Sequence, residues 1–164
     1  LESTDDSLVD GDAQLRAEPV DLAHELRELV TEAGQRGIHR DQTLHLDCQS
    51  PTAYAHIDKS RCVVALRELI DILLYLNPVR TRLDIAVEPQ DTEIRIALDT
   101  GAARLPAWQE IALGKTSGDV TLRLALSWIQ HAIQDNAGRI FTERLPGSES
   151  PKIVIHFPRA PANG

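Results

Sequence analysis

An Asp-Thr-Gly triplet, Asp99 to Gly101, directly follows an apolar run and could present a carboxylate for acid–base chemistry. Aspartic proteases use a pair of such carboxylates that share one proton. The chain has one triplet, so a protease site would require a dimer. Those proteases are almost entirely β, whereas the patterning of this chain indicates three helices. We therefore disfavour the protease interpretation.

Gly-Lys-Thr-Ser at residues 114–117 is a second stretch with possible chemistry, because Gly-Lys-Ser/Thr closes a phosphate-binding P-loop. A P-loop also needs a glycine five residues before the Gly-Lys pair, where this chain has Gln109. It should follow a strand, which the local pattern does not indicate. We interpret the stretch as a loop whose lysine could touch a phosphate.

The histidines and cysteines do not predict a metal site or a nucleophile. His45 and His56 fall in neighbouring predicted strands, and the histidines show no spacing typical of metal ligands. We interpret these two as polar strand residues on a solvated face. No local sequence supports Cys48 as a nucleophile. With Cys62 as the remaining thiol, there are too few cysteines for a disulfide framework, and we expect two reduced thiols.

Length and composition bound the class of protein. The 164 residues suit one domain, and 42% hydrophobic but 4% aromatic residues predict an aliphatic core. A formal net charge of −8 disfavours a general nucleic-acid or anionic-membrane binder. No apolar run approaches the roughly 18 residues of a membrane helix. Because the chain lacks methionine, we expect a piece of a larger protein.

The elements that must position these residues follow from apolar periodicity. Residues 1–19 are acidic and polar and predict a linker, followed by a single domain over 20–160. Strands in hairpin pairs separated by single helices predict an α+β fold. This is a two-layer α/β sandwich with a mixed, mostly antiparallel sheet and three helices on one face. We expect helices at 20–36, 60–76 and 119–136, and strands at 43–48, 53–58, 82–89, 93–100, 139–145 and 152–157.

Three stretches, taken in order, resemble the catalytic and ATP-binding domain of bacterial sensor histidine kinases, the Bergerat (GHKL, HATPase) fold. Residues 58–78 lie without a gap on the N-box helix of that family. Residues 97–106 are similar to its G1 box, and residues 123–140 to its G2 box and the helix that follows. The opening Leu-Glu-Ser is similar to the end of a dimerisation helix, so residues 1–19 would be a linker after a missing dimerisation domain.

The resemblance implies that Asp99, Thr100 and Gly101 are the retained part of a nucleotide pocket, in which the aspartate accepts a hydrogen bond from the adenine amino group. Family members hold Mg²⁺ and phosphate with two N-box asparagines, and phosphates with glycines of the G2 box. This chain departs from that pattern at seven pocket positions: Glu68, Ile72, Tyr75, Ala103, Thr121, Arg123 and Ala125.

The substitutions on the N-box helix are expected to weaken the binding of Mg²⁺ and of phosphate. Ile72 has no oxygen to offer Mg²⁺, a cation that prefers oxygen ligands. A Glu68 carboxylate about 4 Å from a phosphate would cost roughly 4 kcal/mol at an effective dielectric of about 20. We therefore expect no catalytic residue, no metal site and no cofactor in this chain, with ATP and Mg²⁺ relevant only if the domain is active.

The resemblance, with these losses, predicts a degenerate ATPase-like domain of a two-component sensor histidine kinase or histidine phosphotransfer protein, a pseudokinase in a phosphorelay. Its expected partners are the dimerisation helices of the same protein and a response regulator. We expect a cytoplasmic location, either free or as the cytoplasmic part of a membrane-anchored sensor. We expect no contact with nucleic acid and no direct contact of this fragment with a membrane. The alternative is a divergent, active kinase that phosphorylates a histidine in the missing upstream domain. An anti-sigma-factor-type kinase or another Bergerat protein also fits the fold.

Overall fold

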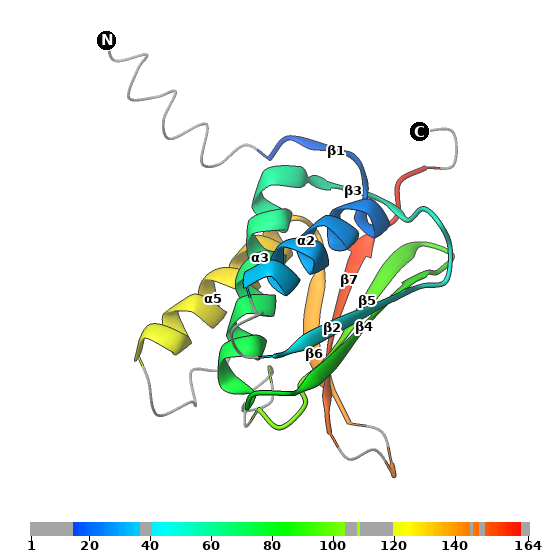
Figure 1. Ribbon diagram of the computed structural model, residues 1–164. Coiled ribbons are helices and arrows are strands. Elements are labelled where there is room, and N and C mark those ends of the chain that lie inside the picture. The colour runs from blue at the N-terminus through cyan, green and yellow to red at the C-terminus, as the bar shows by residue number, and fades with distance from the viewer. Residues whose placement is uncertain are drawn as a thin grey trace.

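Three helices cover one face of a sheet in the computed structural model, which describes residues 15–36, 41–103, 108, 120–144, 146–147 and 150–161 (Figure 1). The predicted two-layer sandwich is confirmed. The helices are α2 (Leu22–Arg36), α3 (Lys59–Leu76) and α5 (Val120–Asp135). The strands are β1 (Ala17–Asp21), β2 (Thr43–Cys48), β3 (Tyr54–Asp58), β4 (Arg82–Pro89), β5 (Glu93–Asp99), β6 (Arg139–Glu143) and β7 (Lys152–Pro158).

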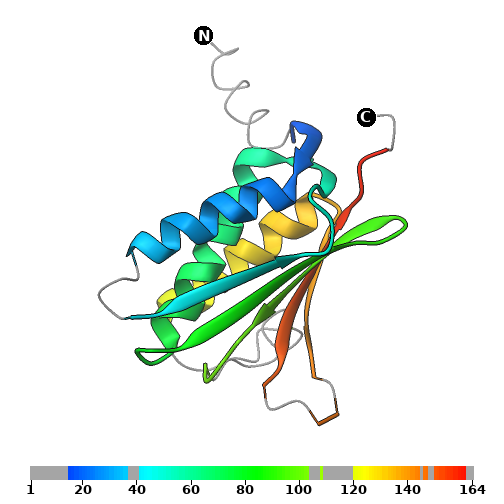
Figure 2. The ribbon, with the colours of Figure 1, turned by 45° about the vertical axis from the view of Figure 1, so that its right-hand side comes forward.

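The main sheet has five strands in the order β2-β4-β5-β7-β6. β2 and β4 are parallel and the other pairs are antiparallel, which confirms the mixed, mostly antiparallel sheet. Alternation decides which face each strand buries. In β4, Leu83, Ile85 and Val87 are buried while Arg82 and Asp84 are exposed. The helices lie over the buried face (Figure 2).

The predicted hairpin of residues 43–58 is wrong. β2 pairs with β4, whereas β3 pairs antiparallel with β1 in a separate two-stranded sheet. Alternation shows that a segment is a strand but does not identify its partner. β1 was missed because Val20 is its single buried residue. Among the described residues, the first element therefore begins at Ala17, inside the segment expected to be linker, and α2 begins at Leu22 rather than residue 20.

The core lies between the helix layer and the sheet. α3 packs its apolar stripe inward, and α5 contributes a second stripe beside it. This burial supplies the main stabilisation, since each fully buried aliphatic side chain contributes about 1.5–3 kcal/mol. The buried helical residues are Cys62, Ala65, Leu66, Leu69, Ile70 and Leu73 of α3 and Leu126, Ile129, Ala132 and Ile133 of α5.

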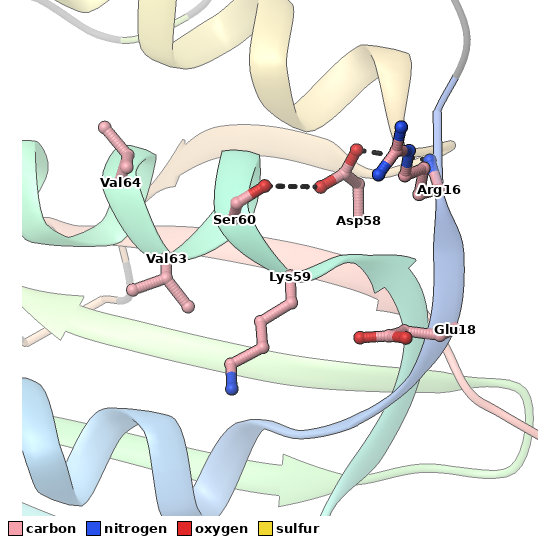
Figure 3. Close-up of a pocket in the computed structure, with 7 residues that line it drawn as sticks. All are labelled: Arg16, Glu18, Asp58, Lys59, Ser60, Val63 and Val64. Atoms are coloured by element: carbon pink, nitrogen blue, oxygen red, sulfur yellow. Dashed lines mark hydrogen bonds between the residues drawn. The ribbon is translucent and has the colours of Figure 1, made fainter.

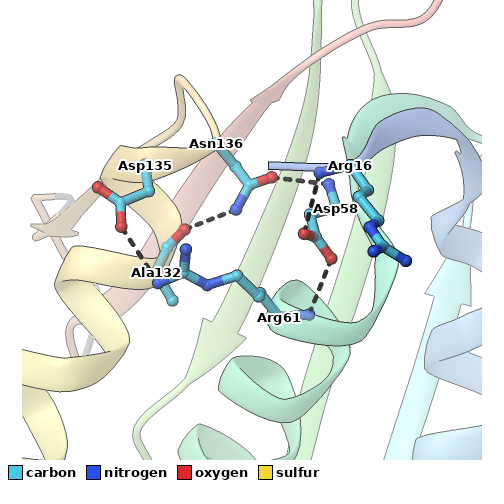
Figure 4. A network of polar contacts seen from close by, with 6 residues as sticks. All are labelled: Arg16, Asp58, Arg61, Ala132, Asp135 and Asn136. Carbon is cyan, nitrogen blue, oxygen red and sulfur yellow. Dashed lines mark hydrogen bonds and ion pairs between the residues drawn. The ribbon is translucent and has the colours of Figure 1, made fainter. Parts of the chain in front are cut away.

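Asp58 caps the start of α3. Its carboxylate accepts hydrogen bonds from the Ser60 hydroxyl (3.0 Å) and the backbone N–H of Arg61 (3.4 Å). It also accepts one from the backbone N–H of Arg16 (3.2 Å), which ties the chain before β1 to the helix (Figure 4). The cap therefore serves two elements at once.

Asn136 joins the end of α5 to the same point. Its amide oxygen accepts from the backbone N–H of Asp58 (2.7 Å), and its amide nitrogen donates to the carbonyl of Ala132 (2.8 Å). An ion pair between Arg61 and Asp135, at 3.2 Å, lies beside it (Figure 4). The end of α5 thus meets the start of α3, so the two helices run in opposite directions.

At the C-terminal end of α5 the residue with left-handed backbone is Ala137, with φ 58°, and not the glycine that follows it. Gly138 is needed for a different reason. A Cβ at this position would lie 2.7 Å from the carbonyl oxygen of His156 and 2.9 Å from a methyl carbon of Ile133. The glycine therefore permits a close approach of the helix end to β7.

Acid should weaken the fold in part through Asp58. Burial alone raises the pKa of this carboxyl, but the hydrogen bonds from Arg16, Arg61 and Ser60 outweigh burial and lower the pKa below its usual value. A lowered folded-state pKa contributes stability that is complete above the unfolded pKa of about 3.9 and is lost as the pH falls through the folded value. Wild type should therefore be more stable than Asp58→Asn at pH near 6, and the gap should close below pH of about 4. Urea unfolding across this range measures it; a gap independent of pH would contradict the assignment.

Candidate functional site

Asp99 lies at the end of β5, at the start of a tight turn. Its Oδ1 accepts hydrogen bonds from the backbone N–H of Gly101 (3.0 Å) and from the hydroxyl of Ser150 (2.9 Å). The buried Thr100 donates its hydroxyl to the carbonyl of Pro151 (2.8 Å). Asp99, Thr100 and Gly101, which the resemblance gives as retained, thus form one turn. Hydrogen bonds to Ser150 and Pro151 hold this turn against the segment before β7.

The side chain of Asn77 connects the same turn to the end of α3 through hydrogen bonds. The side chain is 1% exposed. Its amide nitrogen donates to the carbonyls of Leu73 (2.7 Å) and Thr100 (3.0 Å), and its amide oxygen accepts from the N–H of Ala102 (2.7 Å). Gly101 has φ 58°, and a Cβ there would lie 2.5 Å from Asn77 Oδ1. The turn therefore requires both an amide at 77 and a glycine at 101.

Two residues of this arrangement, Asn77 and Ser150, were not predicted from the sequence. The Asn-Pro pair was a usable signal for Asn77, because an asparagine at a helix end can bond to nearby backbone. Ser150 lies 51 residues from Asp99 in the chain and carried no comparable signal.

The three substituted positions on α3 lie on one stripe, at spacings i, i+4 and i+7. Glu68 is exposed and makes none of the described ion pairs, and Tyr75 is 78% exposed. Ile72 is partly buried and packs against the core. An apolar side chain offers no ligand atom, and no group of three His, Cys, Asp or Glu in the described residues could hold a metal ion. Ile72 therefore offers Mg²⁺ none of the oxygen ligands that this cation prefers.

The other substituted positions lie on two elements. Ala103 is 9% exposed and follows the Asp99 turn. On α5, Thr121 and Arg123 are exposed and Ala125 is half buried. The hydrogen bonds given above join the turn to α3 and to the segment before β7, not to α5. Residues 114–117, with the P-loop-like sequence, lie outside the described residues.

The positions of His45, His56 and the two cysteines do not support a metal site at the histidines or a nucleophilic thiol. His45 is on β2 and His56 on β3, which belong to different sheets, so they are not cross-strand neighbours. Burial raises the pKa of the Cys62 thiol to about 12. Burial also raises the pKa of the Cys48 thiol, against a lowering effect of Arg27. A thiolate nucleophile at neutral pH is therefore disfavoured at both positions.

Known structures share this arrangement of helices and sheet. The nucleotide-free catalytic domain of histidine kinase ThkA superimposes with a TM-score of 0.74 at 16% identity, over 89% of this chain and 99% of that one. The mycobacterial sensor histidine kinase MprB gives 0.70 at 16% identity, over 88% and 99%. ThkA in complex with the response regulator protein TrrA gives 0.74 at 14% identity, over 99% and 48%.

The chain therefore has the fold of the catalytic, ATP-binding domain of sensor histidine kinases, as the resemblance predicted. No protein-family model matches the sequence, and no curated protein matches it. Among the described helices, none is long and apolar enough to span a membrane.

Proposed function

We propose that the chain is a degenerate ATPase-like domain of a two-component sensor histidine kinase or histidine phosphotransfer protein. It acts in a phosphorelay as a scaffold and binds little or no Mg-ATP. The observation that carries this proposal is Ile72, an apolar residue packed against the core where the resemblance places a metal-binding asparagine. Phosphoryl transfer depends on a metal to neutralise the developing charge, so this loss bears on turnover as well as binding.

The exposed Glu68 adds to the same conclusion. Its carboxylate lies on the same stripe of α3 as Ile72, beside the position at which the resemblance would place a triphosphate. Together, the two substitutions remove a cation site and introduce a charge of the wrong sign. The Asp99 turn, by contrast, keeps its hydrogen bonds to Ser150 and Asn77, so the loss is confined to other positions of the pocket.

A contact role is supported by the surface of α5. Val120, Leu124 and Trp128 recur at i, i+4 and i+8 and are 55%, 65% and 42% exposed. An apolar stripe at this spacing suits packing against another helix. The partner we propose for it is the dimerisation helices of the same protein. A response regulator is the second proposed partner, because the ThkA structure includes one. A cytoplasmic location follows from this proposal.

Leu124→Asp is therefore expected to weaken binding to the dimerisation helices by about tenfold or more, because it places a charge in the centre of an apolar contact. The fold should tolerate the change, since Leu124 is 65% exposed. Val79→Asp is the matched control, because Val79 is 58% exposed and lies beyond the end of α3. Equal affinities for the two variants, measured by calorimetry, would remove α5 from the interface.

The second candidate is an active, divergent kinase, and the retained Asp99 turn favours it. Phosphorylation separates the two functions. The chain, joined to its upstream helices, is incubated with γ-labelled ATP and Mg²⁺, and acid-labile label on histidine is measured against an active sensor kinase. We expect no label above background. Label at a rate near that of the active kinase would establish the alternative.

A further inference from the structure

A pocket with a volume of about 480 Å³ lies at the start of α3, beside the segment that enters β1 (Figure 3). Arg16 and Lys59 in its lining are balanced by Glu18 and Asp58, and the Lys59 ammonium already lies 3.7 Å from a carboxylate oxygen of Glu25. The pocket therefore selects neither an anion nor a cation. The outer edge of β2 is a more specific surface.

β2 is the strand at one end of the main sheet, and no other described strand pairs with its outer side (Figure 2). On its inner side, the backbone N–H groups of Thr43 and Gln49 donate to the carbonyls of Thr81 and Val87, at 3.0 and 3.1 Å. Backbone hydrogen-bonding groups alternate in direction along a strand. The N–H and C=O groups of the even-numbered residues of β2 therefore point away from β4, toward this outer edge.

The side chains of β2 alternate as well. His45 and Asp47 are exposed on the face of the sheet that points away from the helices. Leu44, Leu46 and Cys48 pack against the core, and they are still partly exposed. A strand added at this edge would cover the apolar surface that remains open.

Exposed sheet edges usually carry a feature that prevents pairing with a further strand, such as a proline, a lysine or a bulge. β1 has such a feature. The N–H of Leu22 donates to the carbonyl of Ala53, so by alternation Pro19 lies at the side of β1 that faces away from β3, where it offers no N–H. Residues 43–48 contain no proline, glycine or lysine, and they pair with β4 without a bulge. The edge of β2 is thus open to a strand.

The sequence of β2 complements itself in one register. A two-fold axis at Leu46 gives an antiparallel pair of strands, in which Leu46 lies opposite Leu46 of the second copy and Leu44 lies opposite Cys48. Each of these pairs exchanges two backbone hydrogen bonds through the outward groups. On the other face, His45 lies opposite Asp47, which places an imidazole against a carboxylate. A shift by one residue would place Leu44 opposite Asp47 and would use backbone groups that already face β4, so the register is fixed.

α2 packs over β2 and leaves open space beside the edge. Arg27 of α2 donates to the carbonyl of Pro51, in the loop that follows β2, at 3.3 Å. Gly34 lies on the same stripe of the helix, at i+7 from Arg27. An added Cβ at Gly34 would meet nothing within 4 Å. This side of α2 can therefore approach the α2 helix of a second copy.

We propose that two copies of the chain pair through β2 in this register and join their main sheets into one. α5 packs beside β6, at the other end of the sheet, so the contact leaves the apolar stripe of α5 free for the partner proposed above. A single pair of strands buries less than the roughly 1,200–2,000 Å² of a stable interface, so we expect a dissociation constant on the order of 100 µM. The contact does not depend on whether the domain binds nucleotide.

Charge complementation tests the pairing, with sedimentation equilibrium of the whole chain as the measurement. The double variant His45→Lys with Asp47→Lys places lysine opposite lysine, and the single variant His45→Asp places carboxylate opposite carboxylate. Both positions are exposed, so both variants should fold. Each variant alone should self-associate at least about tenfold more weakly than wild type, and an equimolar mixture should recover the wild-type affinity.

Asp84→Lys is the matched control, because Asp84 lies beside His45 on β4, one strand away from the edge. It should self-associate as wild type does, and so should Leu124→Asp. Loss of self-association in Leu124→Asp would overturn the proposal, because the dimer would then form through α5. A wild-type chain that stays monomeric at about 1 mM would also overturn it. The same holds for a mixture that associates no more tightly than the separate variants.

Discussion

Replacing Asn77 by alanine is expected to lower the free energy of unfolding by about 3 kcal/mol or more. The change removes three hydrogen bonds at a side chain that is 1% exposed. The carbonyl of Thr100 keeps a hydrogen bond from the N–H of Ala103 (3.0 Å), whereas the N–H of Ala102 loses its bond to the side chain. A hydrogen bond is worth about 0.5–1.5 kcal/mol net, so the loss of three accounts for the expected effect. Urea unfolding of the two proteins measures the difference.

Gln134→Ala serves as the control for Asn77→Ala, because Gln134 is an exposed amide on α5. Exposed substitutions usually change stability by no more than about 0.5 kcal/mol. If Asn77→Ala costs no more than this control, the hydrogen bonds do not hold the turn, and the account of the Asp99 region fails.

Gly101→Ala is the second substitution with a large expected effect, a loss of about 3 kcal/mol or more. The residue has φ 58°, and a Cβ would lie 2.5 Å from Asn77 Oδ1 and 2.7 Å from a methyl carbon of Leu83. The left-handed backbone alone costs an alanine about 1–2 kcal/mol. The remainder is overpacking against groups that are themselves held in place.

Gly147→Ala separates these two contributions. Gly147 also has a positive φ, 81°, but a Cβ there would meet nothing within 4 Å. It should therefore show the backbone cost alone, about 1–2 kcal/mol. A double-mutant cycle adds a second check, because Gly101→Ala should cost less once Asn77→Ala has removed the clashing oxygen. Equal losses for the two glycines would show that the contact with Asn77 is not tight.

Local patterning predicted those parts of the fold that depend on near neighbours. α3 begins at Lys59, one residue before its expected start, and the β4–β5 and β6–β7 hairpins pair as expected. Each of these elements shows its buried side as a repeating apolar pattern. The parallel pairing of β2 with β4 could not be predicted in the same way, because strands of similar pattern can exchange partners without a change in their own sequence.

The residues of the candidate site also fall into two groups, those that near neighbours in the sequence identify and those that depend on distant contacts. The Asp99 turn was identified because its three residues are adjacent. Asn77 acts on Thr100, which lies 23 residues further along the chain. Its importance comes from burial and from the close approach of Gly101, and neither is visible in a local pattern. Ile72 was recognised as a loss only through the resemblance, since an isoleucine on a helix is otherwise an ordinary packing residue.

The central claim is that the fold of a histidine kinase catalytic domain is kept here while the capacity to bind Mg-ATP is lost. Calorimetric titration of the chain with ATP and ADP, each with and without Mg²⁺, tests it most directly. We predict no binding of Mg-ATP at millimolar nucleotide, and any weak adenine binding should be independent of the metal and abolished by Asp99→Ala. Micromolar, Mg²⁺-dependent binding of ATP would contradict the account.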